Sequence, residues 1–247
     1  MDRFVFIASS GASQLLEQQA IAAHNLANAS TAGYKAETTA FRVAPVVGPG
    51  LPTRAYALDT TTGADLSPGV LQPTGRDLDI AIEGEGFFQI KMPDGQTAYS
   101  RDGSFQISDQ GVLVTSGGQT LEPQIRVPED ASELTISNTG IVTVRRGNDI
   151  QPTEIGRIEL ANFANPSGLY SLGQNLYAPT AASGQPVVGV PAEDGMGRLQ
   201  QGSLEGSNVE IVTEMVEMIS AMRAYEIASK AVKTADEMGQ IANNITR

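Results

Sequence analysis

The sequence predicts an α+β fold in which long N- and C-terminal helices pair as a coiled-coil domain and the middle forms a mainly antiparallel β domain. All 13 prolines lie between Pro45 and Pro191, and proline is excluded from helix interiors. Both ends carry apolar residues every three or four positions, the period of one helix face, whereas the middle carries short alternating runs between turn residues. We predict three regions: a terminal helical domain at 1–36 and 203–247, an extended Pro/Gly-rich linker at 37–76, and a β-rich outer domain at 77–202.

The first helix is predicted over residues 2–31. Its apolar stripe is narrow and rich in small residues, which allows a partner helix to approach closely: Phe4, Ala8, Ala12, Leu15, Ala22, Leu26 and Ala29. Gly33 follows at a position typical of the residue that ends a helix. Because the chain has a second helical end of matching character, we expect the two ends to pair.

The second helix is predicted over residues 207–247. Ser207 and Glu210 form the pattern of a capping box, in which two side chains satisfy backbone donors at the helix start. The apolar stripe that follows is broad: Val212, Met215, Ile219, Met222, Tyr225, Ala228, Val232, Ala235, Met238, Ala242 and Ile245. At 1.5 Å per residue the helix would be roughly 60 Å long. We therefore expect it to pack against another long helix or against something outside the globular body.

Between the helices, the linker is predicted to be extended and irregular, with at most one short strand near residues 54–58. In the β domain, Leu78, Ile80 and Ile82 alternate with acidic residues, which indicates an amphipathic strand. Residues 92–95 have the composition of a type I turn. Further strands are expected at 87–90, 97–100, 105–107, 112–115, 119–121, 134–137, 141–145, 157–163 and 176–178. Short strands separated by frequent turns predict an antiparallel sandwich or an irregular barrel.

Composition argues against several classes of function. The net charge is −12 and no basic run occurs, so neither nucleic acid nor an anionic membrane surface is an expected partner. No apolar run is long enough for membrane insertion. The chain has no cysteine, which removes disulfides and thiolate metal sites. The lack of cysteine fits a reduced cytosol and equally an export route without disulfide formation. The first seven residues lack the apolar core of a secretory signal, so we expect no cleaved signal.

No catalytic constellation is predicted. The single histidine, His24, lies in the first helix, where a structural role is favoured over a catalytic one. An acidic patch could serve glycoside hydrolysis or calcium binding, although the solvent face of an amphipathic strand explains it better: Asp77, Asp79, Glu83 and Glu85. A hydrolase that uses this patch is the enzymatic alternative. We expect no enzyme activity, no cofactor and no metal site.

Three blocks of sequence resemble the rod and hook family of axial proteins of the bacterial flagellum. They are residues 25–35 (NLANASTAGYK), residues 84–88 and 99–105 followed by Gly111 (GEGFF and YSRDGSF), and residues 205–209 with 223–226 (EGSNV and RAYE). The blocks stand in the order expected for the family and cover nearly the whole chain. Within the family, the start of the chain, the run at 14–20 and the modest length are most similar to proximal rod subunits, and distal rod subunits are the alternative.

The resemblance implies a structural subunit of the periplasmic rod in the flagellar basal body. In that family the terminal helices form a coiled coil in the wall of a hollow drive shaft, which carries torque from the motor to the hook. The implied partners are copies of the same chain, other proximal and distal rod subunits, and the flagellar type III export apparatus, which passes the chain without a cleaved signal peptide.

The same resemblance gives a set of expected site residues. The assembly interface is expected at Phe4, Leu15, Leu26, Asn25, Asn28, Ile219, Met222, Tyr225 and Val232. The two asparagines are expected to bond across to another segment or to cap the helix end, and Arg101 and Asp102 to fix a turn. The rival from another class is a secreted binding module on a coiled-coil stalk, which would form a stable oligomer by itself.

Overall fold

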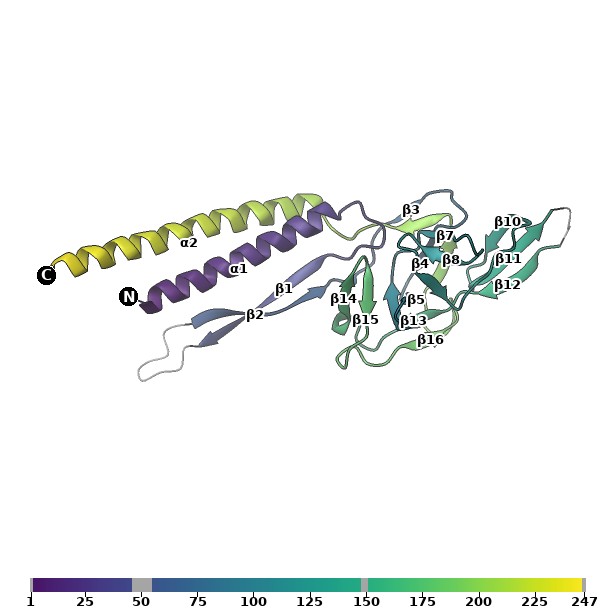
Figure 1. Cartoon of the computed structure of the whole chain (residues 1–247), viewed down its shortest axis with the longest axis horizontal. Helices are drawn as coiled ribbons and strands as arrows, with labels where there is room; N and C mark the ends of the chain where they lie inside the picture. The colour runs from purple at the N-terminus through teal and green to yellow at the C-terminus, as the bar shows by residue number, and fades with distance from the viewer. Residues whose placement is uncertain (1, 46–54, 148–150, 246–247) are drawn as a thin grey trace. The chain divides into compact units, whose positions relative to one another are not determined.

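The computed structural model describes residues 2–45, 55–147 and 151–245 (Figure 1). The chain divides into two compact units. The first contains Met1–Ala29, Glu37–Gly63 and Val209–Arg247, and the second contains Ser30–Ala36 and Ala64–Asn208. The first unit holds two long helices and the second holds most of the strands, so the predicted α+β class is confirmed.

The first unit is built on α1, which spans Asp2–Ala27, and α2, which spans Ile211–Ile245. At 1.5 Å per residue these helices are about 39 Å and 52 Å long. They lie side by side and run in opposite directions, so that the start of α1 and the end of α2 lie at the same end of the pair (Figure 1).

α1 ends earlier, and α2 begins later, than the sequence predicts. α1 stops at Ala27 because the side chain of Asn28 donates from Nδ2 to the His24 carbonyl at 2.9 Å and caps the last turn. Gly33 therefore lies in a later turn, with a φ of 67°. The predicted capping box of Ser207 is wrong, since α2 begins four residues after it.

The late start of α2 has a local cause. Asn208 accepts a hydrogen bond from the Ala36 backbone N–H at 2.7 Å and donates to the Asp65 carbonyl at 2.8 Å. These contacts hold the chain at Asn208 in a loop of the second unit, so the helix can begin only afterwards. Glu210 then stands directly before the helix, where its Oε2 accepts a hydrogen bond from Thr213 Oγ1 at 2.9 Å.

The prediction of an irregular linker is wrong, because that region contains three strands. β1 (Glu37–Pro45) and β2 (Ala55–Ala64) pair as a two-stranded sheet in the first unit. β3 (Leu71–Pro73) pairs antiparallel with β18 (Ser203–Glu205) in the second unit. Threonine runs in β1 and β2 favour extended, paired backbone. The strand predicted near residues 54–58 corresponds to the start of β2, and Arg54 lies outside the described residues.

The second unit consists of short antiparallel strands. Its largest sheet has nine strands, along the path β14-β15-β6-β5-β9-β8-β7, with β13 joined to β5 and β16 joined to β13. The sheet β10-β11-β12 and the pairs β17-β4 and β18-β3 complete the unit. The remaining bounds are β4 Ile80–Glu83, β5 Phe87–Lys91, β6 Thr97–Ser100, β7 Phe105–Ile107, β8 Leu113–Thr115, β9 Thr120–Glu122, β10 Ala131–Ile136, β11 Ile141–Arg146, β12 Thr153–Arg157, β13 Leu160–Asn162, β14 Tyr170–Gly173, β15 Leu176–Ala178, β16 Val187–Gly189 and β17 Arg198–Gln201, with a 3₁₀ turn at Pro166–Gly168.

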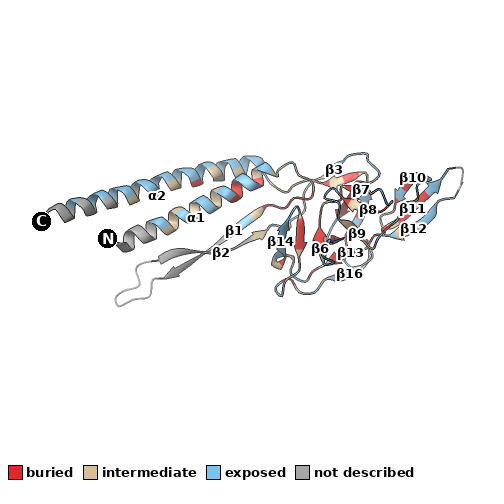
Figure 2. Cartoon of the chain, viewed as in Figure 1, coloured by how far each residue is buried: buried red, intermediate tan, exposed pale blue. Residues whose placement is uncertain are grey.

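Two apolar clusters form the core of this unit, and the buried strands stand out in Figure 2. Phe88 and Phe105 pack edge to face in the larger cluster, with ring centroids 5.1 Å apart. Phe87 and Tyr99 belong to the smaller cluster. Because successive side chains of a strand point to opposite faces, β5 joins the two clusters and is buried on both sides.

The predicted strands and turns agree with the structure in several places. The ranges predicted at 97–100, 105–107 and 176–178 match β6, β7 and β15, and the turn at 92–95 is closed by a 2.9 Å hydrogen bond from Gly95 N to Met92 O. The strand predicted at 157–163 is divided into β12 and β13, because the chain leaves β11 there and joins β5 and β16.

Candidate assembly surface

The first three turns of α2 expose a row of large apolar side chains. These are Ile211, Val212, Met215, Val216, Ile219 and Met222, with exposed fractions of 70% for Val212, 46% for Ile219 and 44% for Met222. Most of the described part of α2 is exposed and is drawn pale blue in Figure 2. Monomeric soluble proteins rarely leave a contiguous apolar surface of this kind in water, and such surfaces mark interaction sites.

The buried residues of α1 and α2 lie where the two helices pack against each other. α1 buries Ile21, Ala22 and Asn25, and α2 buries Ala221. The pairing of α1 with α2 therefore covers one face of α2 and leaves its other apolar face without cover within the described part of the chain.

The predicted interface residues fall into three groups in the structure. Ile219 and Met222 belong to the exposed row, whereas Leu15, Leu26, Asn28, Tyr225 and Val232 are half-buried and Asn25 is buried. The side chain of Phe4 lies outside the described residues. The structure therefore does not gather these residues on one surface, and their role in assembly stays a prediction.

Asn25 joins three segments of the first unit. Its Nδ2 donates to the Glu37 carbonyl and to Glu214 Oε1, both at 2.9 Å, and its Oδ1 accepts from the Glu37 backbone N–H at 2.8 Å. These bonds connect the end of α1 to the start of α2 and of β1. Burial raises the pKa of Glu214, and the hydrogen bond from Asn25 opposes that rise.

The bonding predicted for the two asparagines is present, since Asn25 bonds across to other segments and Asn28 caps the end of α1. His24 is exposed, and its Nδ1 lies 3.3 Å from Glu37 Oε2.

The second unit contains a buried cluster of three charged side chains. Glu205 Oε1 lies 2.6 Å from Lys35 Nζ, and Glu205 Oε2 lies 3.4 Å from Arg101 Nη1. The exposed fractions of these side chains are 0% for Lys35, 1% for Glu205 and 6% for Arg101. The Gly69 backbone N–H also donates to Glu205 Oε1, at 2.8 Å. We call these three side chains the charged triad.

The two cations of the triad have further partners. Lys35 Nζ donates to the Ser67 carbonyl at 2.7 Å, and Arg101 Nη2 donates to the Gly84 carbonyl at 2.9 Å. The Arg101 guanidinium also lies 5.1 Å from the ring centroid of Phe87, within cation–π range. Burial lowers the pKa of both Lys35 and Arg101, and the contact with Glu205 opposes that change.

Sequence reasoning missed the triad, because charged residues are expected at the surface unless they are paired. The turn roles predicted for Arg101 and Asp102 agree with their contacts. Arg101 donates to the Gly84 carbonyl, in the turn between β4 and β5. Asp102 fixes its own turn, with its Oδ1 accepting from Ser104 N at 2.9 Å and Ser104 Oγ at 2.7 Å. One signal could have found the triad: Lys35, Arg101 and Glu205 each stand in a different one of the three sequence blocks described above.

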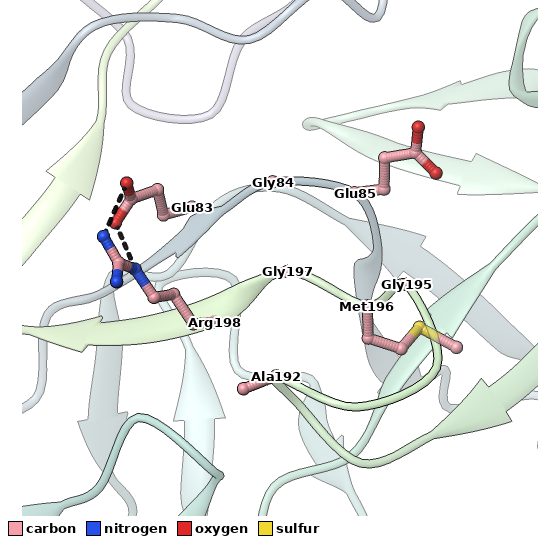
Figure 3. A pocket seen from close by; sticks show the side chains of 8 residues that line it. All are labelled: Glu83, Gly84, Glu85, Ala192, Gly195, Met196, Gly197 and Arg198. Carbon is pink, nitrogen blue, oxygen red and sulfur yellow. Dashed lines mark hydrogen bonds and ion pairs between the residues drawn. The ribbon is translucent and has the colours of Figure 1, made fainter.

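An open pocket lies beside the end of β4 and the start of β17 (Figure 3). Arg198 forms a bidentate ion pair with Glu83, with N···O distances of 2.7 Å and 2.9 Å, and this pair lowers the pKa of Glu83. Asp79 is buried and accepts a hydrogen bond from Thr74 Oγ1 at 2.7 Å. The prediction that the whole acidic patch faces solvent is therefore wrong for Asp79, whereas Asp77, Glu83 and Glu85 are exposed.

Among the described residues, no group of three or more histidine and carboxylate side chains is arranged to hold a metal ion. Neither of the two helices, over its described residues, is long and apolar enough to cross a membrane.

Comparison with known proteins assigns all three blocks to related families. Residues 7–35 match the flagella basal body rod protein family, residues 81–144 match the flagellar hook protein FlgE/F/G D1 domain, and residues 200–245 match the C-terminal region of the flagellar basal body rod FlgEFG proteins.

Similar proteins cover most of the chain. The flagellar basal-body rod protein FlgG of Agrobacterium fabrum is 42% identical, in an alignment that covers 98% of each chain. FlgG of Borreliella burgdorferi is 51% identical over 72% of this chain and 68% of its own length. The flagellar basal-body rod protein FlgF of Escherichia coli is 36% identical over 99% of this chain and 98% of its own length.

A helix pair with an uncovered apolar face, joined in sequence to a β unit, is an arrangement typical of a protein that assembles with other subunits. The extent and identity of the matches make the family plain: the chain belongs to the FlgE/F/G family of flagellar basal-body rod proteins. This is a family of structural proteins and not of enzymes.

Proposed function

We propose that the chain is a structural subunit of the flagellar rod that polymerises through α1 and α2. In the polymer the two helices pair as a coiled coil in the wall of a hollow shaft, and the shaft transmits torque from the motor to the hook. The apolar row on α2 carries this proposal, because a neighbouring subunit would remove from water the side chains that the helix pair leaves exposed. Each fully buried aliphatic side chain contributes roughly 1.5–3 kcal/mol to such a contact.

The assembly interface in this proposal comprises Phe4, Leu15, Leu26, Asn25, Asn28, Ile219, Met222, Tyr225 and Val232. Its partners are further copies of the chain and other rod subunits. The chain reaches the rod through the flagellar export apparatus.

Within the rod, we favour a distal position over the proximal one first inferred from the start of the chain and its length. The support is that FlgG relatives are 38–51% identical to this chain, whereas FlgF relatives are 36% identical. The proximal position stays the second candidate, because FlgF of Escherichia coli matches over 99% of the chain.

Complementation distinguishes the two positions. The chain is expressed in bacteria that lack either their own FlgG or their own FlgF, and swimming in soft agar is measured. Recovery only in the strain without FlgG is the result expected for a distal subunit. Recovery only in the strain without FlgF would assign the proximal position instead.

A pair of substitutions tests the assembly surface itself. Ile219→Glu places a charge in the apolar row and is expected to abolish incorporation into isolated basal bodies, whereas Ser220→Glu, on the next residue of the same helix, is the matched control. Sedimentation of the purified chain addresses the rival stalked binding module, which requires a stable oligomer in isolation. Such an oligomer, together with normal incorporation of Ile219→Glu, would contradict the proposal.

A further inference from the structure

The outer faces of α1 and α2 carry two rows with the same spacing. We call Val212, Met215, Ile219 and Met222 the α2 ridge, and Ser13, Leu16, Ala20, Ala23 and Ala27 the α1 stripe. All of these residues are exposed. Each row advances by alternating steps of three and four residues, the heptad spacing with which helices pack side chains into one another's gaps.

Each row lies on the side of its helix that faces away from the helix pair. Buried Ala221 is two residues from Ile219, and buried Ala22 is two residues from Ala20. Two residues correspond to about 200° around a helix, so the α2 ridge and the α1 stripe point outward on opposite sides of the pair.

The two rows are complementary in size. The α2 ridge consists of valine, isoleucine and methionine, whereas the α1 stripe consists of alanine and serine apart from Leu16. Facing positions that alternate large and small residues interdigitate without voids. The α2 ridge of one copy therefore fits the α1 stripe of another copy better than it fits a second ridge.

Charge agrees with the same arrangement. Glu17 borders the α1 stripe and Arg223 borders the α2 ridge, both exposed and neither in an ion pair with another described residue. Within one chain, Asn25 bonds to Glu214. Ala20 precedes Asn25 by five residues and Ile219 follows Glu214 by five. If α2 of one copy and α1 of the next copy have this same antiparallel register, Ile219 of the first copy lies against Ala20 of the second. Arg223 of the first copy then lies within one residue of Glu17 of the second.

From these observations we infer that the α2 ridge of each subunit packs on the α1 stripe of the next copy of the same chain, antiparallel and without an axial shift. This inference rests on the proposed function. The contact is heterologous, since it joins two different surfaces, and it leaves one ridge and one stripe free at the ends of any row of copies. Such contacts build rings or filaments rather than closed dimers.

Cysteine crosslinking tests the pairing, because the chain has no cysteine of its own. Two differently tagged versions, Ala20→Cys and Ile219→Cys, are co-expressed in the bacterium that encodes the chain, with its own gene deleted. Basal bodies are then isolated and treated with a short bis-maleimide crosslinker. A crosslinked heterodimer is expected. Its loss is expected when Ser220→Cys replaces Ile219→Cys, because Ser220 lies about 100° away around the helix.

A second pair, Ala23→Cys with Met215→Cys, serves if a variant of the first pair fails to incorporate. Incorporation of both variants without a heterodimer, or an equal yield with Ser220→Cys, overturns the inference and leaves the proposed function intact. Absence of the unsubstituted chain from basal bodies would instead refute the proposed function, so the two failures are distinguishable.

Discussion

Substitution of Glu205 by glutamine should strongly destabilise the second unit. Glu205 is the acidic partner of two cations that are almost fully buried, Lys35 and Arg101. Glu205→Gln removes the negative charge and leaves both positive charges without compensation in a region that solvent cannot screen. Removal of one partner from a buried ion pair costs about 3–5 kcal/mol. Because domains unfold with roughly 5–15 kcal/mol, this loss is at least about a fifth of the total free energy of unfolding.

The measurement is thermal and urea unfolding of the purified full chain, followed by circular dichroism. For units of this size each kcal/mol shifts the melting temperature by about 2–4 °C, so we expect a decrease on the order of 10 °C. Glu83→Gln is the matched control, since it removes the acidic partner of the exposed Arg198 pair and should change the melting temperature little. A Glu205→Gln variant that melts with the unsubstituted chain would refute the reasoning.

A double variant sharpens this test. Lys35→Met in the Glu205→Gln background removes one of the two stranded charges, and buried ion pairs are often replaced by apolar residues without loss of stability. The double variant should therefore be more stable than Glu205→Gln alone. Additive destabilisation by the two substitutions would show that the side chains act independently.

Three other substitutions test separate parts of the structure. Asn25→Ala removes the partner of the Glu37 backbone N–H, at a cost of about 1–3 kcal/mol for each buried group left unpaired, and amide hydrogen exchange at Glu37 should accelerate. Gly33→Ala places a Cβ 2.4 Å from the Asp102 backbone nitrogen, whereas Gly75→Ala has the same sign of φ but open space, so only the first should lower the urea midpoint strongly. Asp102→Asn tests the pKa of the Asp102 carboxyl, which burial raises above 3.8 in the folded chain. The folded chain therefore keeps this proton at pH values at which the unfolded chain has lost it. Stability falls as the pH rises from the ordinary pKa through the raised pKa. The variant, unfolded by urea across that range, should lack this fall.

The sequence predicted the helices well because their signals are local. Apolar residues at helical spacing placed α1 and α2 within a few residues of their bounds, and turn chemistry placed the turn at 92–95. The boundary at Ser207 was wrong because it depends on Asn208, whose partners Ala36 and Asp65 are far away in the sequence. The strands β17 and β18 were missed for the same reason, since their pairing partners β4 and β3 lie more than a hundred residues earlier.

The site was less predictable than the fold. Ile219 and Met222 were selected by periodicity alone, yet periodicity does not tell the side of a helix that faces its partner from the side that stays exposed. The buried state of Lys35, Arg101 and Glu205 has no local signature, because each side chain alone would be assigned to the surface. Only the arrival of all three at one point in the folded chain makes their burial favourable.

The charged triad also constrains when the second unit can finish folding. Its first member is residue 35 and its last is residue 205. In the same way, β3 pairs with β18 and β4 pairs with β17, so neither early strand has its partner until the late strand is present. A chain delivered with its N-terminus first cannot bury Lys35 beside its carboxylate partner until more than four-fifths of its length is free. Contacts this distant in sequence are slow to form. The late position of Glu205 in the sequence therefore delays the folding of the segment around Lys35 until most of the chain is available to fold.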